Sequence, residues 1–193
     1  MEVYQMKKAI GPGTFLYPMP VVIVGANVGG KPNYLAVAWC GIIHDGPPMI
    51  VMCLGKSHYT NPGIRENGTF SVNIPSGDMA EATDYVGMKS GKEVDKSKLF
   101  ENFYGKLGTA PMIKECPLSL ECKLVDTLDY GGPEEIFVGE IIECYADERC
   151  LTDGKPDVRK IDPISFAPGD DGYWRLGERI GDAWSIGEGY DRT

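Results

Sequence analysis

Short apolar runs, separated by glycine, proline and asparagine, recur along most of the chain. A β-branched run at residues 21–24 precedes a turn at residues 27–31, which contains Gly29-Gly30, and a second apolar run covers residues 34–43. Two such runs around a glycine turn predict a β-hairpin. Further strands are expected at residues 49–54 and 69–74, because each run is bounded by turn-forming residues.

Two short helices are expected among these strands. Thr60 can cap a helix over residues 60–66, and Asp78 can cap a second over residues 78–86. The polar segment 91–108 holds three apolar residues spaced like one face of a helix. They are Leu99, Phe100 and Phe103.

A long antiparallel pair dominates the second half of the chain. Residues 118–125 alternate, with Leu118, Leu120, Cys122 and Leu124 on one side and Ser119, Glu121 and Lys123 on the other. A turn at residues 129–134 leads to a return strand at residues 136–145. Closely spaced strands with few helices predict a mainly β barrel with short inserted helices, not a doubly wound α/β sheet. We expect one domain over residues 1–193.

Composition narrows the class of partner. The 19 basic and 28 acidic side chains give a formal net charge of -9, and no Lys/Arg run is present. Wrapping around nucleic acid is therefore disfavoured, although an acidic protein can still carry a local positive pocket for a small anion. Residues 1–8 lack the apolar stretch of a signal peptide, and no apolar run is long enough to cross a membrane, so we expect a cytoplasmic protein.

The six cysteines show no metal-binding spacing. No two of them are arranged as C-x-x-C, and the chain has only two histidines. We interpret most of them as buried, reduced thiols. The alternative is a metal site formed by four of them, Cys116, Cys122, Cys144 and Cys150.

Two nucleotide-binding motifs are incomplete. The segment that begins at Gly25 lacks the G-x-G-x-x-G order and leads into a strand. Gly55-Lys56-Ser57 resembles the end of a P-loop, but Ile50 stands where that motif needs its first glycine. Neither a Rossmann fold nor an NTPase is predicted.

The turn after the third strand could still hold an anion. A strand that leads into a helix N-terminus offers free backbone N–H groups and a favourable dipole. Lys56 adds a positive charge, and Ser57 and Thr60 add hydroxyl donors. Taken alone, this segment favours a capped, solvated turn over an anion site, because surface turns are commonly rich in such residues.

A second candidate region lies in residues 33–41. Ala36, Ala38 and Gly41 are small enough to let a flat ligand approach the backbone, and Asn33 can donate and accept hydrogen bonds. Trp39 is expected in the core. Cys40 has no neighbouring histidine or lysine to activate its thiol. Farther along, Asn73 ends a strand, where it can cap the chain or bind a ligand, and capping is favoured.

Six segments in register resemble the flavoredoxin branch of the flavin reductase-like, FMN-binding split-barrel proteins. They are PNYLAVAWCG at 32–41, GPPMI at 46–50, Tyr59-Thr60 with Ile64, FSVNIP at 70–75, SGKEVDK at 90–96 and FVGEI at 137–141. The resemblance covers most of the chain. It implies a Greek-key split barrel that binds FMN non-covalently, usually at a homodimer interface.

The resemblance also implies a set of contacts. The backbone at Ala38, Trp39 and Cys40 would border the flavin ring, with Asn33 near by. The turn would hold the phosphate through Lys56, Ser57, His58, Tyr59 and Thr60, and Asn73 and Lys92 would line the site. Many relatives carry arginine where His58 stands, so Lys56 would have to compensate, or FMN would bind more weakly as pH rises above the histidine range.

Such a protein would transfer electrons or hydride from a reduced nicotinamide, or a similar donor, to a flavin, metal ion or protein acceptor. The flavin would carry the redox chemistry. The alternative is a non-catalytic flavin-binding or redox-sensing dimer on the same barrel.

Overall fold

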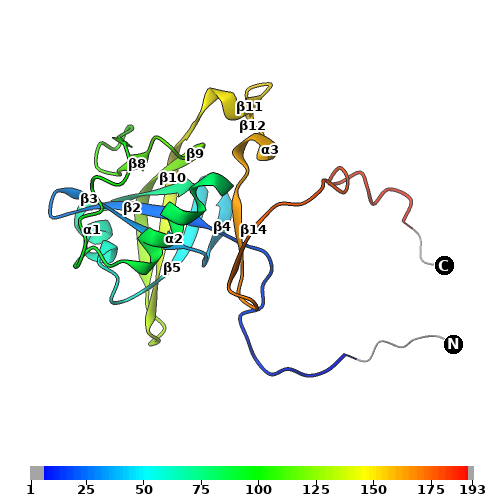
Figure 1. The fold of residues 1–193 in the computed structure, drawn as a ribbon, viewed down its shortest axis with the longest axis horizontal. Coiled ribbons are helices and arrows are strands. Elements are labelled where there is room, and N and C mark those ends of the chain that lie inside the picture. The colour runs from blue at the N-terminus through cyan, green and yellow to red at the C-terminus, as the bar shows by residue number, and fades with distance from the viewer. Residues whose placement is uncertain (1–6, 191–193) are drawn as a thin grey trace.

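The computed structural model describes residues 7–190, and seven antiparallel strands form its main sheet (Figure 1). In spatial order they are β3 (Lys31–Val37), β2 (Val22–Val28), β6 (Thr69–Ile74), β9 (Leu118–Leu128), β10 (Glu134–Ala146), β5 (Pro48–Gly55) and β4 (Cys40–Asp45). The two outermost strands, β3 and β4, are consecutive in the chain. The sheet therefore curls until β3 and β4 lie next to each other, joined by residues 38–39 but not hydrogen-bonded as a strand pair. This gap in the sheet makes the fold a split barrel of Greek-key type.

The barrel interior is filled by the inward-facing residue of every second strand position. Phe70 from β6, Phe137 from β10 and Met52 from β5 are fully buried there. Helix α1 (Thr60–Asn67) closes one end of the barrel with Ile64, which is also fully buried. Because α1 packs on the barrel end, its N-terminus is fixed against strands β2 and β3.

A second apolar layer covers the outer face of β2 and β3. The short helix η1 (Gly77–Met79) leads into α2 (Ala80–Met88), whose Val86 packs there with Ile23 and Tyr34. The segment that follows α2 adds Phe100 and Ile113 to this layer. The rings of Phe100 and Tyr34 pack edge to face, with their centroids 5.3 Å apart. Strands β7 (Asn102–Phe103) and β8 (Met112–Ile113) pair within this segment.

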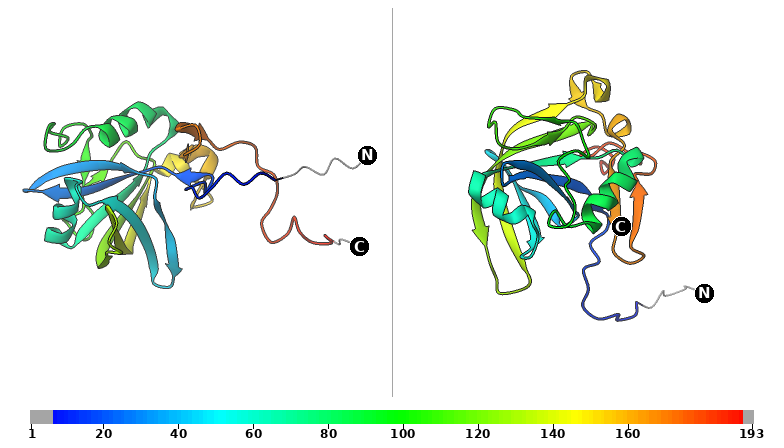
Figure 2. Two further views of the ribbon diagram at one scale, coloured as in Figure 1. Left: turned by 90° about the horizontal axis from the view of Figure 1, so that it is seen from below. Right: turned by 60° about the vertical axis from the view of Figure 1, so that its left-hand side comes forward.

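A smaller sheet lies beside the barrel, in the order β1 (Met19–Pro20), β13 (Ile164–Ala167) and β14 (Gly172–Arg175). Between β10 and β13 come η2 (Glu148–Cys150), β11 (Leu151–Thr152), β12 (Lys155–Pro156) and α3 (Val158–Ile161). The segments before β1 and after β14 run out from the same side of the barrel (Figure 2). Among residues 7–190, no helix is both long and apolar enough to span a membrane. Residues 1–6, part of the segment in which no signal peptide is predicted, lie outside the described residues.

Strand positions are confirmed more closely than helix ends. The strand expected at residues 69–74 is β6, and the long pair is β9 and β10. The single strand expected at residues 34–43 is wrong, because the chain breaks at residues 38–39 to pass from one sheet edge to the other. Neither expected cap is found, since Tyr59 precedes α1 and Asp78 lies inside η1.

Two sequence patterns in the second half of the chain take a different form from the one that their spacing suggests. Residues 91–108 contain turns and β7 but no helix, because Phe100 is drawn inward onto Tyr34 while Leu99 stays exposed. The side of β9 that carries Ser119 and Glu121 is covered and not solvated. Glu121 is fully buried there and accepts hydrogen bonds from the backbone N–H groups of Lys106 and Leu107.

Candidate functional site

A cleft of about 230 Å³ opens where the turn before α1 faces the end of α2. We call it the turn cleft; it is lined by Asn33, by the predicted residues Ser57, His58, Tyr59 and Thr60, and by Gly91 and Lys96. Five of the predicted site residues therefore meet in one place. They come from β3 and from the turn that joins β5 to α1.

A buried hydrogen bond ties the two sides of the turn cleft together. The Asn33 Nδ2 group donates to the Thr60 Oγ1 atom at 2.8 Å. Gly91 closes over this pair, and a Cβ atom at that position would overlap Asn33 Oδ1 and Tyr59 Cδ1. The sequence at position 91 is thus restricted to glycine by close packing against the cleft.

The N-terminus of α1 contributes positive potential to the turn cleft. The first N–H groups of a helix have no partner within the helix. Here no side chain caps them and the first turn holds no acidic residue, although the Asn61 N–H donates to the His58 oxygen at 3.3 Å and Pro62 has no N–H. The helix dipole is therefore left uncompensated at the end that faces the cleft, which suits an anion.

His58 has a buried ring nitrogen that makes no hydrogen bond within the described chain. Its Nδ1 atom is inaccessible to solvent and has no partner. The other edge of the ring lies over Gly55. Burial, followed by the charge of Lys96, lowers the pKa of His58 below its ordinary value, so the ring is neutral at pH 7. A buried polar atom without a partner is uncommon and suggests a ligand group at this point.

Lys96 was not among the predicted contacts, although it ends one of the segments that carry the resemblance. It is 3% exposed and donates to the backbone oxygens of Tyr34 and Val86, each at 2.8 Å. An ammonium has three N–H donors, so one remains for the cleft. Burial lowers its pKa to about 8. Its position among surface lysines in the sequence gave no sign that it would be buried.

A second cleft, of about 300 Å³, shares His58 with the first. We call it the strand cleft; Ala36, Ala38, Trp39 and Leu54 line it. Trp39 was expected in the core, but its side chain lies at the gap between the sheet edges and is 43% exposed. Cys40 adjoins these residues, and burial raises the pKa of its thiol to about 11.

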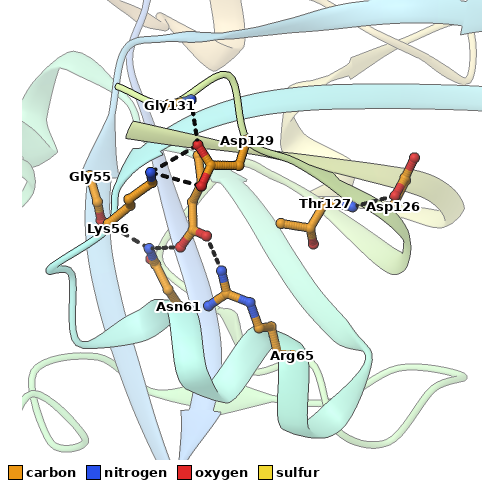
Figure 3. Close-up of polar contacts among 9 residues, drawn as sticks. Gly55, Lys56, Asn61, Arg65, Asp126, Thr127, Asp129 and Gly131 are labelled. Carbon is orange, nitrogen blue, oxygen red and sulfur yellow. Dashed lines mark hydrogen bonds and ion pairs between the residues drawn. The ribbon is translucent and has the colours of Figure 1, made fainter. Parts of the chain in front are cut away.

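Lys56 is turned away from the turn cleft, so its expected contact with a phosphate is not supported. Its Nζ atom pairs with Asp129 at 2.8 Å (Figure 3). Its backbone N–H donates to the Pro133 oxygen. Both partners belong to the β9–β10 connection. Lys92 lines an adjoining cleft of about 210 Å³ that shares Asn33, Tyr59, Gly91 and Lys96 with the turn cleft.

Asn73 does not join the other predicted residues. It is fully buried, and its amide group donates to the oxygens of Ile23 and Ser71. Its Oδ1 atom accepts from the Ile113 N–H and the Ser119 hydroxyl. With both ends of the amide engaged, Asn73 holds β6 to its neighbours and is not free to contact a ligand.

A polar network behind the turn fixes its shape (Figure 3). Asn61 Nδ2 donates to the Gly55 oxygen at 2.9 Å and to Glu135 Oε1 at 2.8 Å. Arg65 pairs with the other oxygen of Glu135 and lies 5.0 Å above the ring of Phe137. The turn is thus anchored from inside by Asn61 and from outside by Lys56.

The four cysteines of the alternative metal site are not brought together. Cys116 and Cys122 are buried, whereas Cys144 is exposed. In the part of the chain that the structure describes, no three His, Cys, Asp or Glu side chains are placed to hold a metal ion.

With the geometry in view, the chain can be compared with known proteins. A family described as "Flavin reductase like domain" matches residues 14–162. The chain belongs to this family.

Two solved flavoredoxin structures are similar to this member of the flavin reductase like family over nearly the whole chain. Flavoredoxin from Methanosarcina acetivorans is 50% identical with a TM-score of 0.92, covering 95% of this chain and 98% of that one. Flavoredoxin of Desulfovibrio vulgaris (Miyazaki F) is 38% identical with a TM-score of 0.89, covering 95% and 100%. An FMN-binding protein from Thermus thermophilus, 22% identical with a TM-score of 0.77 over 94% and 99% of the chains, shares the fold.

Proposed function

We propose that the turn cleft and the strand cleft together bind FMN, with the phosphate at the turn and the ring along residues 36–40. The observation that carries this proposal is the position of His58, which lines both clefts and whose buried Nδ1 atom has no hydrogen-bond partner within the described chain. Family membership and the FMN-binding protein of the same fold support the choice of ligand.

The phosphate end would be held without an arginine. The α1 N-terminus, the hydroxyls of Ser57 and Thr60 and the ammonium of Lys96 can all donate to phosphate oxygens. Lys96 takes the compensating role that the sequence suggested for Lys56. Neutral His58 adds one hydrogen bond, donated by whichever ring nitrogen carries the proton.

The ring end suits a flat aromatic group. Ala36 and Ala38 leave the backbone open to close approach, and Trp39 offers an apolar surface beside them. Bound FMN would supply hydride and electron transfer, a chemistry that needs no side-chain nucleophile. The chain would orient the flavin, keep water from one face and supply hydrogen bonds to its polar edge.

We infer that the protein is an oxidoreductase of the flavoredoxin type. It would accept electrons from a reduced nicotinamide or a similar donor and pass them to a flavin, a metal ion or a protein. The two flavoredoxins that match almost the whole chain support this assignment. The cytoplasmic location stays a prediction.

We also infer that the protein acts as a homodimer. Strand β4 is at the edge of the sheet, and its Ile42 and Ile43 are 65% and 52% exposed. An exposed apolar edge strand is ordinarily covered by a partner, because otherwise it invites aggregation.

Absorbance spectroscopy tests the proposed function. The purified protein, supplied with FMN and freed of excess, should carry one flavin per chain and bleach rapidly when mixed anaerobically with NADH or NADPH in a stopped-flow instrument. Bound flavin that no nicotinamide reduces would favour the non-catalytic alternative or a different donor. A protein that retains no FMN would contradict the proposal.

A further inference from the structure

The segment after β14 is an extended arm that carries large apolar side chains into solvent. We call residues 176–190 the C-terminal arm; it projects from the barrel beside the N-terminal segment (Figures 1 and 2). Ile180 is 91% exposed and Trp184 is 99% exposed. The arm is not shapeless, because backbone hydrogen bonds from Ser185 and Ile186 to the Asp182 oxygen form a turn.

Trp184 has a backbone conformation that its own chain does not explain. Its φ is 61°, in the left-handed region that bulky side chains rarely adopt. Such strain persists where surrounding contacts enforce it. At 99% exposure the Trp184 side chain gains almost no such contact from its own chain. Contacts with a second molecule would compensate for this strain.

The structure also contains a cavity suited to receive such an arm. It has a volume of about 540 Å³, and we call it the terminal cavity. The N-terminal residues Phe15, Leu16 and Met19 line one side of it, and Trp39 and Cys40 line the other. Met19 belongs to β1, which shares a three-stranded sheet with β14, from which the arm departs. The arm and the cavity thus belong to the same side of the molecule.

We propose that the C-terminal arm of one copy docks in the terminal cavity of a second copy, and that the exchange is mutual. A two-fold axis makes this possible, because each copy presents both the arm and its receptor. Trp184 and Ile180 then pack beside Trp39, so the arm of the partner closes the ring end of the candidate flavin site. The proposal rests on the proposed homodimer, but it requires no flavin.

Photo-crosslinking of the full-length, flavin-free chain tests this proposal. Trp184 is replaced by p-benzoylphenylalanine in unlabelled protein, which is mixed with ¹⁵N-labelled wild-type protein, dissociated, reassociated and irradiated. We expect crosslinks from position 184 to labelled peptides that contain residues 13–20 or 38–40. The same replacement at Tyr130, an equally exposed aromatic on the β9–β10 connection, serves as the control and should give none of them.

Crosslinks only to unlabelled peptides of the same chain, at the mass of a monomer, would show that the arm folds back on itself and would overturn the proposal. Labelled crosslinks confined to other surfaces would overturn it too. Sedimentation of the full-length double variant Ile180→Ser and Trp184→Ser gives a second readout. We expect at least a tenfold weaker dimer, whereas an unchanged dimer contradicts the role of the arm.

Discussion

Replacing Glu135 should destabilise both the fold and the flavin site, because this carboxylate anchors the turn through Asn61. Glu135 is 7% exposed and accepts hydrogen bonds from Asn61 and Arg65. In the Glu135→Leu variant both bonds are lost. Arg65 is 43% exposed and can turn to water, so its share is at most about 1 kcal/mol. The bond from the buried Asn61 amide to a carboxylate contributes about 1.5–2 kcal/mol more.

The expected loss for Glu135→Leu is therefore about 2–3 kcal/mol, which lowers the melting temperature by roughly 5–10 °C in a protein of this size. Glu135→Gln keeps an acceptor for Asn61 and loses only the charge, so we expect the free energy of unfolding to fall by about 1 kcal/mol. Flavin affinity should fall about tenfold in the leucine variant, because Asn61 no longer holds the Gly55 oxygen firmly.

Calorimetry of the flavin-free protein and fluorescence titration with FMN measure the two effects separately. Glu140→Gln, on the same strand, is the matched control and should leave both unchanged. If the leucine variant and the wild type have the same melting temperature, the network contributes nothing to stability. If it melts lower yet binds FMN as before, the turn does not depend on Asn61, and the reasoning is refuted.

Four further outcomes are expected. Gly91→Ala should weaken FMN binding at least tenfold, because the new Cβ atom displaces Asn33 and Tyr59. The control Gly132→Ala, whose Cβ atom meets only an ordinary contact, should leave the affinity for FMN unchanged. Equal affinities of the two variants in a fluorescence titration would contradict the packing argument. FMN affinity should fall as pH rises through about 8, where Lys96 loses its charge, and Lys96→Met should abolish that dependence. Without flavin, the free energy of unfolding should instead rise between pH 8 and 10.5, because in this range Lys96 is protonated in the unfolded chain and deprotonated in the folded one. Urea titrations at pH 8 and pH 10.5 measure this increase. Iodoacetamide at pH 8 should modify the exposed Cys144 well before Cys40, because a pKa of about 11 keeps Cys40 a thiol. Mass spectrometry follows the two reactions, and faster modification of Cys40 would contradict this prediction.

The strands of the main sheet and two of its pairs of consecutive strands, β2 with β3 and β9 with β10, could be predicted from the sequence because alternation and turn residues are local signals. The break at residues 38–39 could not, since nothing local distinguishes a strand that crosses a barrel gap from one that continues. The helix-like spacing of Leu99, Phe100 and Phe103 was misleading for a similar reason. Packing of Phe100 on Tyr34 outweighed a spacing that suits a helix.

The candidate site was predicted in part. Asn33 and residues 57–60 meet in one cleft, as the resemblance implied. Lys56 and Asn73 do not, because their partners, Asp129 and Ile113, are distant in sequence and decide where the side chains lie. Lys96 was missed for the converse reason. Its burial depends on two backbone oxygens that the fold alone brings to it.

The central claim is that the turn beside α1 grips the phosphate of FMN, and comparing FMN with riboflavin tests it most directly. The two ligands share the ring and differ in the phosphate. Fluorescence titration at pH 7 should show FMN binding about 100-fold more tightly than riboflavin, a difference of about 2.7 kcal/mol. Equal dissociation constants for the two, or no binding of FMN, would contradict the account.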